Sequence, residues 1–132
     1  MYMDNNDSRV LSRILRYCTQ ISETCTEFDN SKDRFMESAT FRNAVCLCLL
    51  QIGELVSILS DDFRDNNPIM QWREIKAVRN IVAHRYDQVN YDIIWDICEN
   101  DVPVLMDFCT KELKEELEVT EAGEPEENTN EG

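Results

Sequence analysis

Apolar residues recur at spacings of three and four along most of this chain, and this period constrains its fold more than any other feature. Such a period marks a helix with one buried face, which must pack against other elements. Only three glycines and three prolines interrupt the chain, so a turn-rich β fold is disfavoured. We therefore expect an all-α protein, an antiparallel bundle of four to five helices. In the first predicted helix, residues 7–28, the buried face consists of Val10, Leu11, Ile14, Leu15, Cys18, Ile21 and Cys25.

The second helix should be long. Residues 29–31 supply capping and turn chemistry, and the helical pattern resumes after them and continues to about Ser60. The following residues 61–68 are rich in Asp and Asn and end in a proline. We interpret them as a connecting loop.

Two further helical stretches complete the predicted bundle. The third begins near residue 69 or 71 and ends near His84. The fourth runs from about residue 90 towards Leu117. Because proline cannot donate a backbone hydrogen bond, Pro103 either starts a new helix or kinks the old one.

The charge of the chain is strongly acidic and unevenly distributed. Its 132 residues include 27 acids and 13 bases, a net charge of −14. Residues 118–132 contain six acids, no base and almost no apolar side chain, so we expect them to form a disordered tail. We assign residues 1–117 to a single helical domain. This domain still carries −8, which repels nucleic-acid phosphates at long range, so any nucleic-acid site must be local.

The cysteines and the apolar segments set further expectations. All six cysteines lie in amphipathic or apolar stretches, which favours buried free thiols over disulfides. With His84 as the single histidine, and Cys46 and Cys48 too close for a zinc knuckle, we expect no metal and no cofactor. The longest apolar run, residues 44–50, is shorter than the roughly 20 residues that cross a bilayer. The N-terminal residues have no signal-peptide pattern, so we expect a cytoplasmic protein without a membrane contact.

One window is basic against this acidic background. Residues 71–86 carry four bases and the single acid Glu74, a local charge of +3. A solvated helix face is the common explanation for such a cluster. A local phosphate-binding surface is the alternative, in which the RNA-contacting side chains would be Arg73, Lys76 and Arg85 beside Arg79.

The same window contains a motif. Arg79 to Tyr86 reads Arg-Asn-Ile-Val-Ala-His-Arg-Tyr, of the form R-x4-H-x-Y. In its flanking context it resembles the HEPN superfamily, in particular the HepT-like toxins of HEPN/MNT toxin–antitoxin pairs. The likeness covers about residues 8–116 and includes residues 51–54, 72–75, 91–95 and 102–103. It implies a toxin with endoribonuclease activity, a homodimeric cleft in which both motif copies face each other, and a minimal nucleotidyltransferase antitoxin that attaches AMP to Tyr86.

The side chains of the motif suit RNA cleavage without a metal ion. The imidazole of His84 titrates near neutrality and could exchange a proton with a ribose 2′-hydroxyl or with the leaving 5′-oxygen. The guanidinium of Arg79 is a fixed cation that could stabilise the charged transition state. Single-stranded or loop RNA could enter a dimer cleft. On one regular helix the two side chains would point about 140° apart, so either the helix ends between them or two subunits contribute.

Three neighbouring residues have both functional and structural interpretations. Asn80 could bind the phosphate or order the motif, or it could be a surface amide. Glu54 could orient a motif side chain, or it could be an exposed carboxylate. Tyr86 could be a half-buried aromatic residue. Gly53, within a helix, indicates the close approach of another helix.

Two other classes of function remain open at this point. The chain could be a non-catalytic docking subunit for a nucleotidyltransferase, or a nucleotide-binding module, which its acidic surface favours. It could also be a helical bundle with a purely structural role in assembly. The intact motif favours the ribonuclease over both.

Overall fold

The computed structural model describes residues 3–84 and 88–123, and only the backbone of His84 and of residues 119–123. Every regular element in these ranges is helical, which confirms the all-α prediction. In chain order the elements are α1 (Asn5–Glu27), α2 (Lys32–Glu37), α3 (Ala39–Ile58), α4 (Asp61–Asp65), α5 (Trp72–His84), α6 (Tyr91–Asp96), a π-helical segment (Ile97–Asp101) and α7 (Val102–Gly123).

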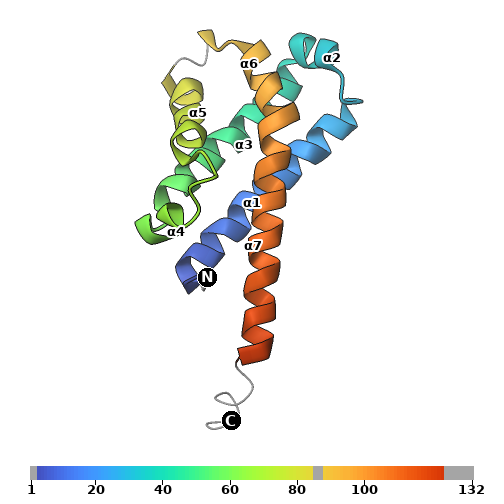
Figure 1. Ribbon diagram of the computed structural model, residues 1–132. Coiled ribbons are helices and arrows are strands. Elements are labelled where there is room, and N and C mark those ends of the chain that lie inside the picture. Colours follow the sequence, from blue (N-terminus) through green and yellow to red (C-terminus); the bar gives the residue numbers. More distant parts are fainter. Residues whose placement is uncertain (1–2, 85–87, 124–132) are drawn as a thin grey trace.

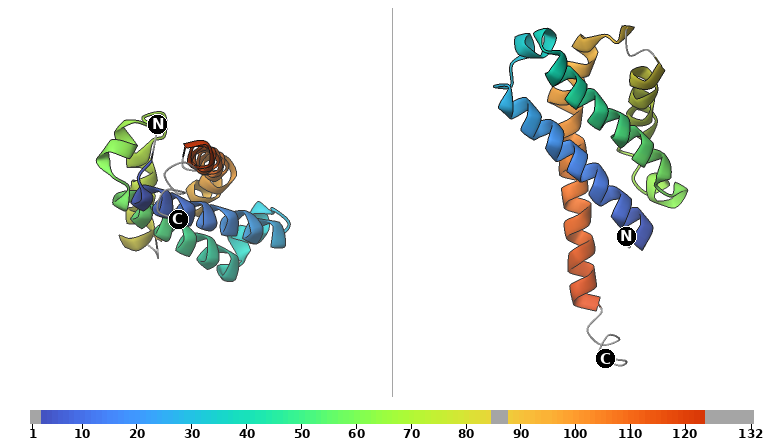
Figure 2. Two further views of the ribbon diagram at one scale, coloured as in Figure 1. Left: turned by 90° about the horizontal axis from the view of Figure 1, so that it is seen from below. Right: turned by 180° about the vertical axis from the view of Figure 1, so that it is seen from behind.

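The four long helices alternate in direction and form an antiparallel bundle, as Figure 1 shows. Helix α1 packs against both α3 and α7, and α3 lies between α1 and α5 (Figure 2). Helix α5 is therefore held mainly by α3. This arrangement places the motif-bearing helix at one side of the bundle, where one of its faces is open to solvent.

The chain between α1 and α4 contains two helices, whereas the sequence pattern predicted one. Ser38 has an extended backbone, with φ −108° and ψ 110°, and its hydroxyl accepts a hydrogen bond from the Phe41 amide at 3.1 Å. A side-chain cap of this kind starts a helix and stops the preceding one. The prediction of one continuous helix is therefore wrong at Ser38. The spacing of apolar residues continues unchanged through this break, so it gave no sign that the helix ends there.

Residues 61–65 form the short helix α4, so the prediction that residues 61–68 are entirely a loop is wrong. The hydroxyl of Ser60 caps α4 by accepting from the Phe63 amide at 3.1 Å. Asp7 in α1, only 3% exposed, accepts hydrogen bonds from the Ser60 amide at 2.8 Å and from its hydroxyl at 2.6 Å. This buried carboxylate ties the start of α1 to the end of α3, and its hydrogen bonds offset the cost of burying the charge.

Pro103 lies at the second position of α7, immediately after the π-helical segment. There the Val102 amide donates to the Ile97 carbonyl, a bond that spans five residues. A π turn inserts one extra residue into a helix, so the residues that follow it are shifted around the helix axis. The helical backbone thus continues from residue 91 into α7 and changes its register just before the proline.

An aromatic cluster joins α2, α3 and α6 at one end of the core. Phe35 and Phe41 are fully buried, and their ring centroids lie 5.0 Å apart in an edge-to-face arrangement. The Phe35 ring also lies 5.2 Å from Trp95 and 6.1 Å from Tyr91. Buried aromatic pairs contribute packing beyond their apolar area. The cluster holds α2 and α6 against α3, the helix on which the motif helix packs.

All six cysteines are free and buried, as the sequence predicted. Burial raises the pKa of Cys18 to about 12 and that of Cys46 to about 11. These thiols therefore remain protonated near neutral pH and behave as apolar core side chains. Within the described residues, no group of three or more His, Cys, Asp and Glu side chains is arranged to hold a metal ion.

Two further findings concern the apolar helix α3 and the C-terminal end of α7. Helix α3 is long and apolar enough to cross a membrane by length and composition, yet half of its apolar window is buried inside the bundle. A core helix has the same properties. Helix α7 continues to Gly123, past the domain boundary predicted after Leu117. The rest of the predicted tail, residues 124–132, lies outside the described residues.

Candidate functional site

The site is built on the crossing of α3 and α5, where Gly53 of α3 faces Arg79 of α5. A Cβ atom added at Gly53 would clash with the Cβ of Arg79 and would lie 3.3 Å from its Cα. The absence of a side chain at this position lets the two helices approach closely. The expectation that Gly53 marks a close helix approach is confirmed, and the residue it approaches is the motif arginine.

The next residue of α3 orients the Arg79 side chain. Nε of Arg79 donates to Oε2 of Glu54 at 2.7 Å, and its Nη1 donates to Oδ1 of Asn80 at 3.2 Å. Two edges of the planar guanidinium are thus fixed by one residue from each helix. The side chains of Arg79 and Glu54 are 35% and 49% exposed, so an anion from solvent can reach them. The structure brings these three predicted site residues together.

The other predicted site residues lie along or beyond the same helix. Helix α5 is unbroken from Trp72 through Arg79 to His84, its last residue. The first explanation for joint action of Arg79 and His84, a helix that ends between them, is therefore wrong. The side chain of His84 and residues 85–87, which include Arg85 and Tyr86, lie outside the described part of the chain.

The predicted RNA-contacting residues Arg73 and Lys76 are both exposed on α5. Lys76 lies about one turn before Arg79 and Arg73 about two turns before it, so they extend the cationic surface along the helix. These bases of the window thus face solvent, as both of its interpretations required.

An exposed apolar stripe on α3 flanks Glu54. Leu47 is 58% exposed and Ile58 is 53% exposed. Both lie on nearly the same face of α3 as Glu54, because Leu47 is seven residues before it and Ile58 four residues after it, and these spacings return to one side of a helix. The sequence analysis missed these two residues as a surface. The sequence did contain a signal for this surface, because both are apolar residues that lie outside the core-facing pattern of the same helix.

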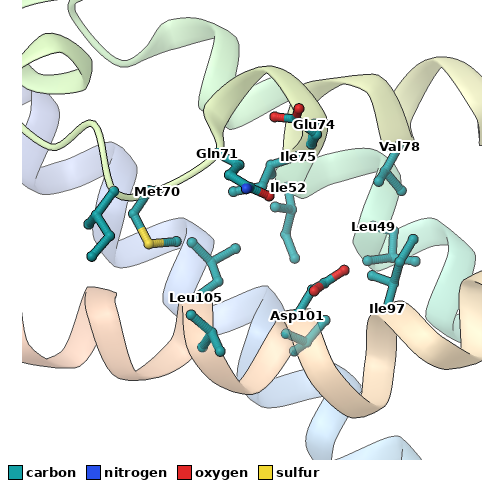
Figure 3. A pocket seen from close by; sticks show the side chains of 13 residues that line it. Leu49, Ile52, Met70, Gln71, Glu74, Ile75, Val78, Ile97, Asp101 and Leu105 are labelled. Atoms are coloured by element: carbon teal, nitrogen blue, oxygen red, sulfur yellow. The ribbon is translucent and has the colours of Figure 1, made fainter.

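A cavity of about 360 Å³ lies on another side of the motif helix, between α5 and the start of α7 (Figure 3). Its wall is mostly apolar, and Glu74 and Asp101 add two carboxyl groups. Burial, with Asp96 nearby, raises the pKa of Asp101. Neither Arg79 nor Glu54 lines this cavity, and its acidic groups would repel phosphate. It is therefore separate from the candidate site, and no sequence pattern indicated it.

Gly53→Ala should test the close helix crossing. We expect this change to lower the free energy of unfolding by about 1–3 kcal/mol, because the added methyl group must displace Arg79. In an unobstructed helix the same change is stabilising by roughly 0.5–1 kcal/mol. Urea denaturation measures the difference. Ala44→Gly, at an exposed position of the same helix, is the matched control and should cost about 1 kcal/mol. A Gly53→Ala protein as stable as the natural one would contradict the crossing.

Comparisons with known proteins identify the family of this chain. The family model "Ribonuclease HepT-like" matches residues 6–112. "Putative RNase MJ1380" of Methanocaldococcus jannaschii is 30% identical over 106 residues, 80% of this chain and 88% of that protein. "Putative RNase TTE0752" of Caldanaerobacter subterraneus is 32% identical over 108 residues, 82% of this chain and 91% of that protein.

"Probable ribonuclease HepT" of Thermococcus cleftensis is 32% identical over 62 residues, 47% of this chain and 56% of that protein. No solved structure shows a significant match. The family match and the all-α bundle of the described residues together place the chain in the HEPN superfamily. This chain belongs to the HepT-like ribonuclease family.

Proposed function

We propose that this protein is a metal-independent endoribonuclease toxin of a toxin–antitoxin pair. The observation that carries the proposal is the Arg79 guanidinium, held at 2.7 Å by Glu54 on an open helix face, five residues before His84 in a HepT-like chain. A fixed guanidinium is pre-organised for a phosphate whose negative charge grows in the transition state. The site would act in the cytoplasm on single-stranded or loop RNA.

The reaction assigns a separate role to each motif residue. His84 takes the proton from a ribose 2′-hydroxyl, and the 2′-oxygen attacks the adjacent phosphorus. The bond from phosphorus to the 5′-oxygen breaks, and that oxygen receives a proton. Arg79 stabilises the pentacoordinate phosphate, while Glu54 and Asn80 position Arg79. The products are a 2′,3′-cyclic phosphate and a 5′-hydroxyl. Arg73, Lys76 and Arg85 would hold the flanking phosphates.

A homodimer is part of the proposal. Because α5 is unbroken from Arg79 to His84, the two residues occupy positions about 140° apart around one helix, and a second motif copy would complete the site. Leu47 and Ile58, exposed on either side of Glu54, offer apolar area for a partner subunit next to the motif. Two copies would double the local positive charge that competes with the acidic surface.

Cleavage of RNA in the presence of a chelator tests this function. The full chain should cut single-stranded RNA in EDTA, and His84→Ala should reduce the rate by about 10²–10⁴-fold, the usual contribution of a general acid or base. Lys111→Ala, a charge change at an exposed position of α7, should cleave like the natural protein. Equal cleavage by the natural protein and His84→Ala would remove His84 from the mechanism.

The docking-subunit alternative is favoured by one observation, the net charge of −14. An acidic surface binds RNA weakly but does not oppose binding to a protein. If the natural protein cleaves no RNA and co-purifies stably with a nucleotidyltransferase, the ribonuclease proposal is overturned and the docking subunit takes its place. A purely structural bundle would show neither behaviour.

Regulation by AMP transfer to Tyr86 has its own test. A co-expressed nucleotidyltransferase antitoxin with ATP should increase the mass of the chain by one or more AMP units, and RNA cleavage should fall. The adenylate adds bulk and negative charge beside the motif, which excludes RNA. Mass spectrometry should find no increase in Tyr86→Phe. An unchanged mass increase in this variant would contradict the assignment of Tyr86.

A further inference from the structure

Two cysteines from distant parts of the chain share a second cavity. This cavity, of about 420 Å³, lies between the end of α1, the π-helical segment and α7. Cys25 of α1 and Cys98 of the π-helical segment both line it, and each is 8% exposed. A small solute in the cavity can therefore reach both sulfur atoms. The other four cysteines do not line this cavity.

The two thiols influence each other and are chemically unequal. Interaction with the Cys98 thiol lowers the pKa of Cys25, and the same interaction, together with burial, raises the pKa of Cys98. Burial and the nearby Glu99 oppose the lowering at Cys25 but do not cancel it. A thiol whose anion is stabilised by a neighbouring donor is the better nucleophile. Cys25 is thus the attacking thiol and Cys98 is the one positioned to resolve.

We propose that Cys25 and Cys98 form an oxidisable dithiol, a modification site that a small neutral hydroperoxide converts to an intramolecular disulfide. The site is independent of the RNA-cleaving motif, so its failure would leave the proposed ribonuclease function intact. The π-helical segment contributes by placing Cys98 opposite α1.

The reaction balances with hydrogen peroxide as the oxidant. The Cys25 thiolate attacks one peroxide oxygen, the O–O bond breaks, and a sulfenic acid forms while hydroxide leaves. The Cys98 sulfur then attacks the Cys25 sulfur, the S–O bond breaks, and the S–S bond forms. With the two thiol protons, both peroxide oxygens leave as water. Two thiols lose two electrons, and the peroxide gains them.

The cavity lining selects the class of oxidant. Glu99 and Asp107 add two carboxylates to the wall. Their negative charge repels an anionic disulfide such as oxidised glutathione and does not oppose a neutral peroxide. The disulfide would join the end of α1 to the π-helical segment and enclose the chain from Cys25 to Cys98, which contains the motif helix. A crosslink over so long a segment restricts the unfolded chain and should raise Tm.

Mass spectrometry of the reduced full-length protein tests the proposal. After treatment with hydrogen peroxide and alkylation of the remaining thiols, we expect a product that has lost two hydrogens and carries four alkyl groups in place of six. Proteolysis should give a crosslinked peptide pair that contains Cys25 and Cys98. Oxidised glutathione at the same concentration should give several-fold less of this product.

Matched variants separate this disulfide from general thiol oxidation. Cys25→Ala and Cys98→Ala should each lose the crosslinked product, whereas Cys109→Ala, at a fully buried cysteine outside the cavity, should retain it. Circular dichroism checks that each variant folds, and the peptide map of the natural protein decides the question if one does not. A disulfide between other cysteines, a sulfinic acid at Cys25 without a crosslink, or no reaction with peroxide would each overturn the proposal.

Discussion

Arg79→Ala should reduce RNA cleavage by about 10²–10³-fold, the loss that follows the removal of one pre-organised donor to a developing negative charge. The natural side chain is fixed on two edges, by Glu54 at 2.7 Å and by Asn80 at 3.2 Å. Alanine removes the guanidinium and leaves no cation at the crossing of α3 and α5. The expected loss is in kcat more than in KM, because the charge that Arg79 stabilises is largest in the transition state.

The loss of activity should not be a loss of folding. The ion pair between Arg79 and Glu54 is partly exposed, and such pairs contribute about 1 kcal/mol or less to stability. Arg79→Lys is the informative companion, because lysine keeps the charge without the planar fork and should recover only part of the rate. Steady-state cleavage of a defined single-stranded RNA measures all three proteins. An Arg79→Ala protein with the natural kcat would contradict the role of Arg79.

Phe35→Ala should lower the free energy of unfolding by about 3–5 kcal/mol, the cost of removing a large buried aromatic side chain. Phe35 is fully buried in α2 and packs on the rings of Phe41, Trp95 and Tyr91 at 5.0 to 6.1 Å. Those rings belong to α3 and α6 and cannot close the space without moving helices. Helix α2 is short, so its position depends on this one side chain.

Urea denaturation followed by circular dichroism measures this effect. Glu37→Ala, an exposed position in the same short helix, is the control and should change stability by about 0.5 kcal/mol or less. The contrast separates burial of Phe35 from helix propensity in α2. A loss below about 1 kcal/mol in Phe35→Ala would show that the aromatic cluster is not a main support of the fold.

The sequence predicted the long helices well, because the spacing of apolar residues reflects the face of each helix that is buried. Helix α1 begins and ends within two residues of its expected limits, and α5 begins at Trp72, next to its expected start. The errors lie where local hydrogen bonds override the period. At Ser38 a hydroxyl cap divides the second helix, and at Ser60 a cap held by Asp7, 53 residues away, starts α4. A contact over that separation has no signature in a local window.

The candidate site was predictable only in part. The motif and Gly53, a glycine within a predicted helix, pointed to Arg79, Glu54 and a close helix approach, and the structure places these groups together. The exposed side chains of Leu47 and Ile58, the interaction of the Cys25 and Cys98 thiols, and both cavities depend on how distant helices are oriented. No spacing along the chain encodes those orientations.

The chemistry of the RNA ends tests the central claim most directly. Single-stranded RNA should be incubated with the full chain in EDTA, and the new ends should be identified by mass spectrometry. Attack by the adjacent 2′-oxygen predicts a 2′,3′-cyclic phosphate and a 5′-hydroxyl, and predicts that a 2′-deoxy substitution at the cleaved nucleotide blocks the cut. Fragments that carry a 3′-hydroxyl and a 5′-phosphate, or cleavage that persists at the deoxy position, would contradict the account.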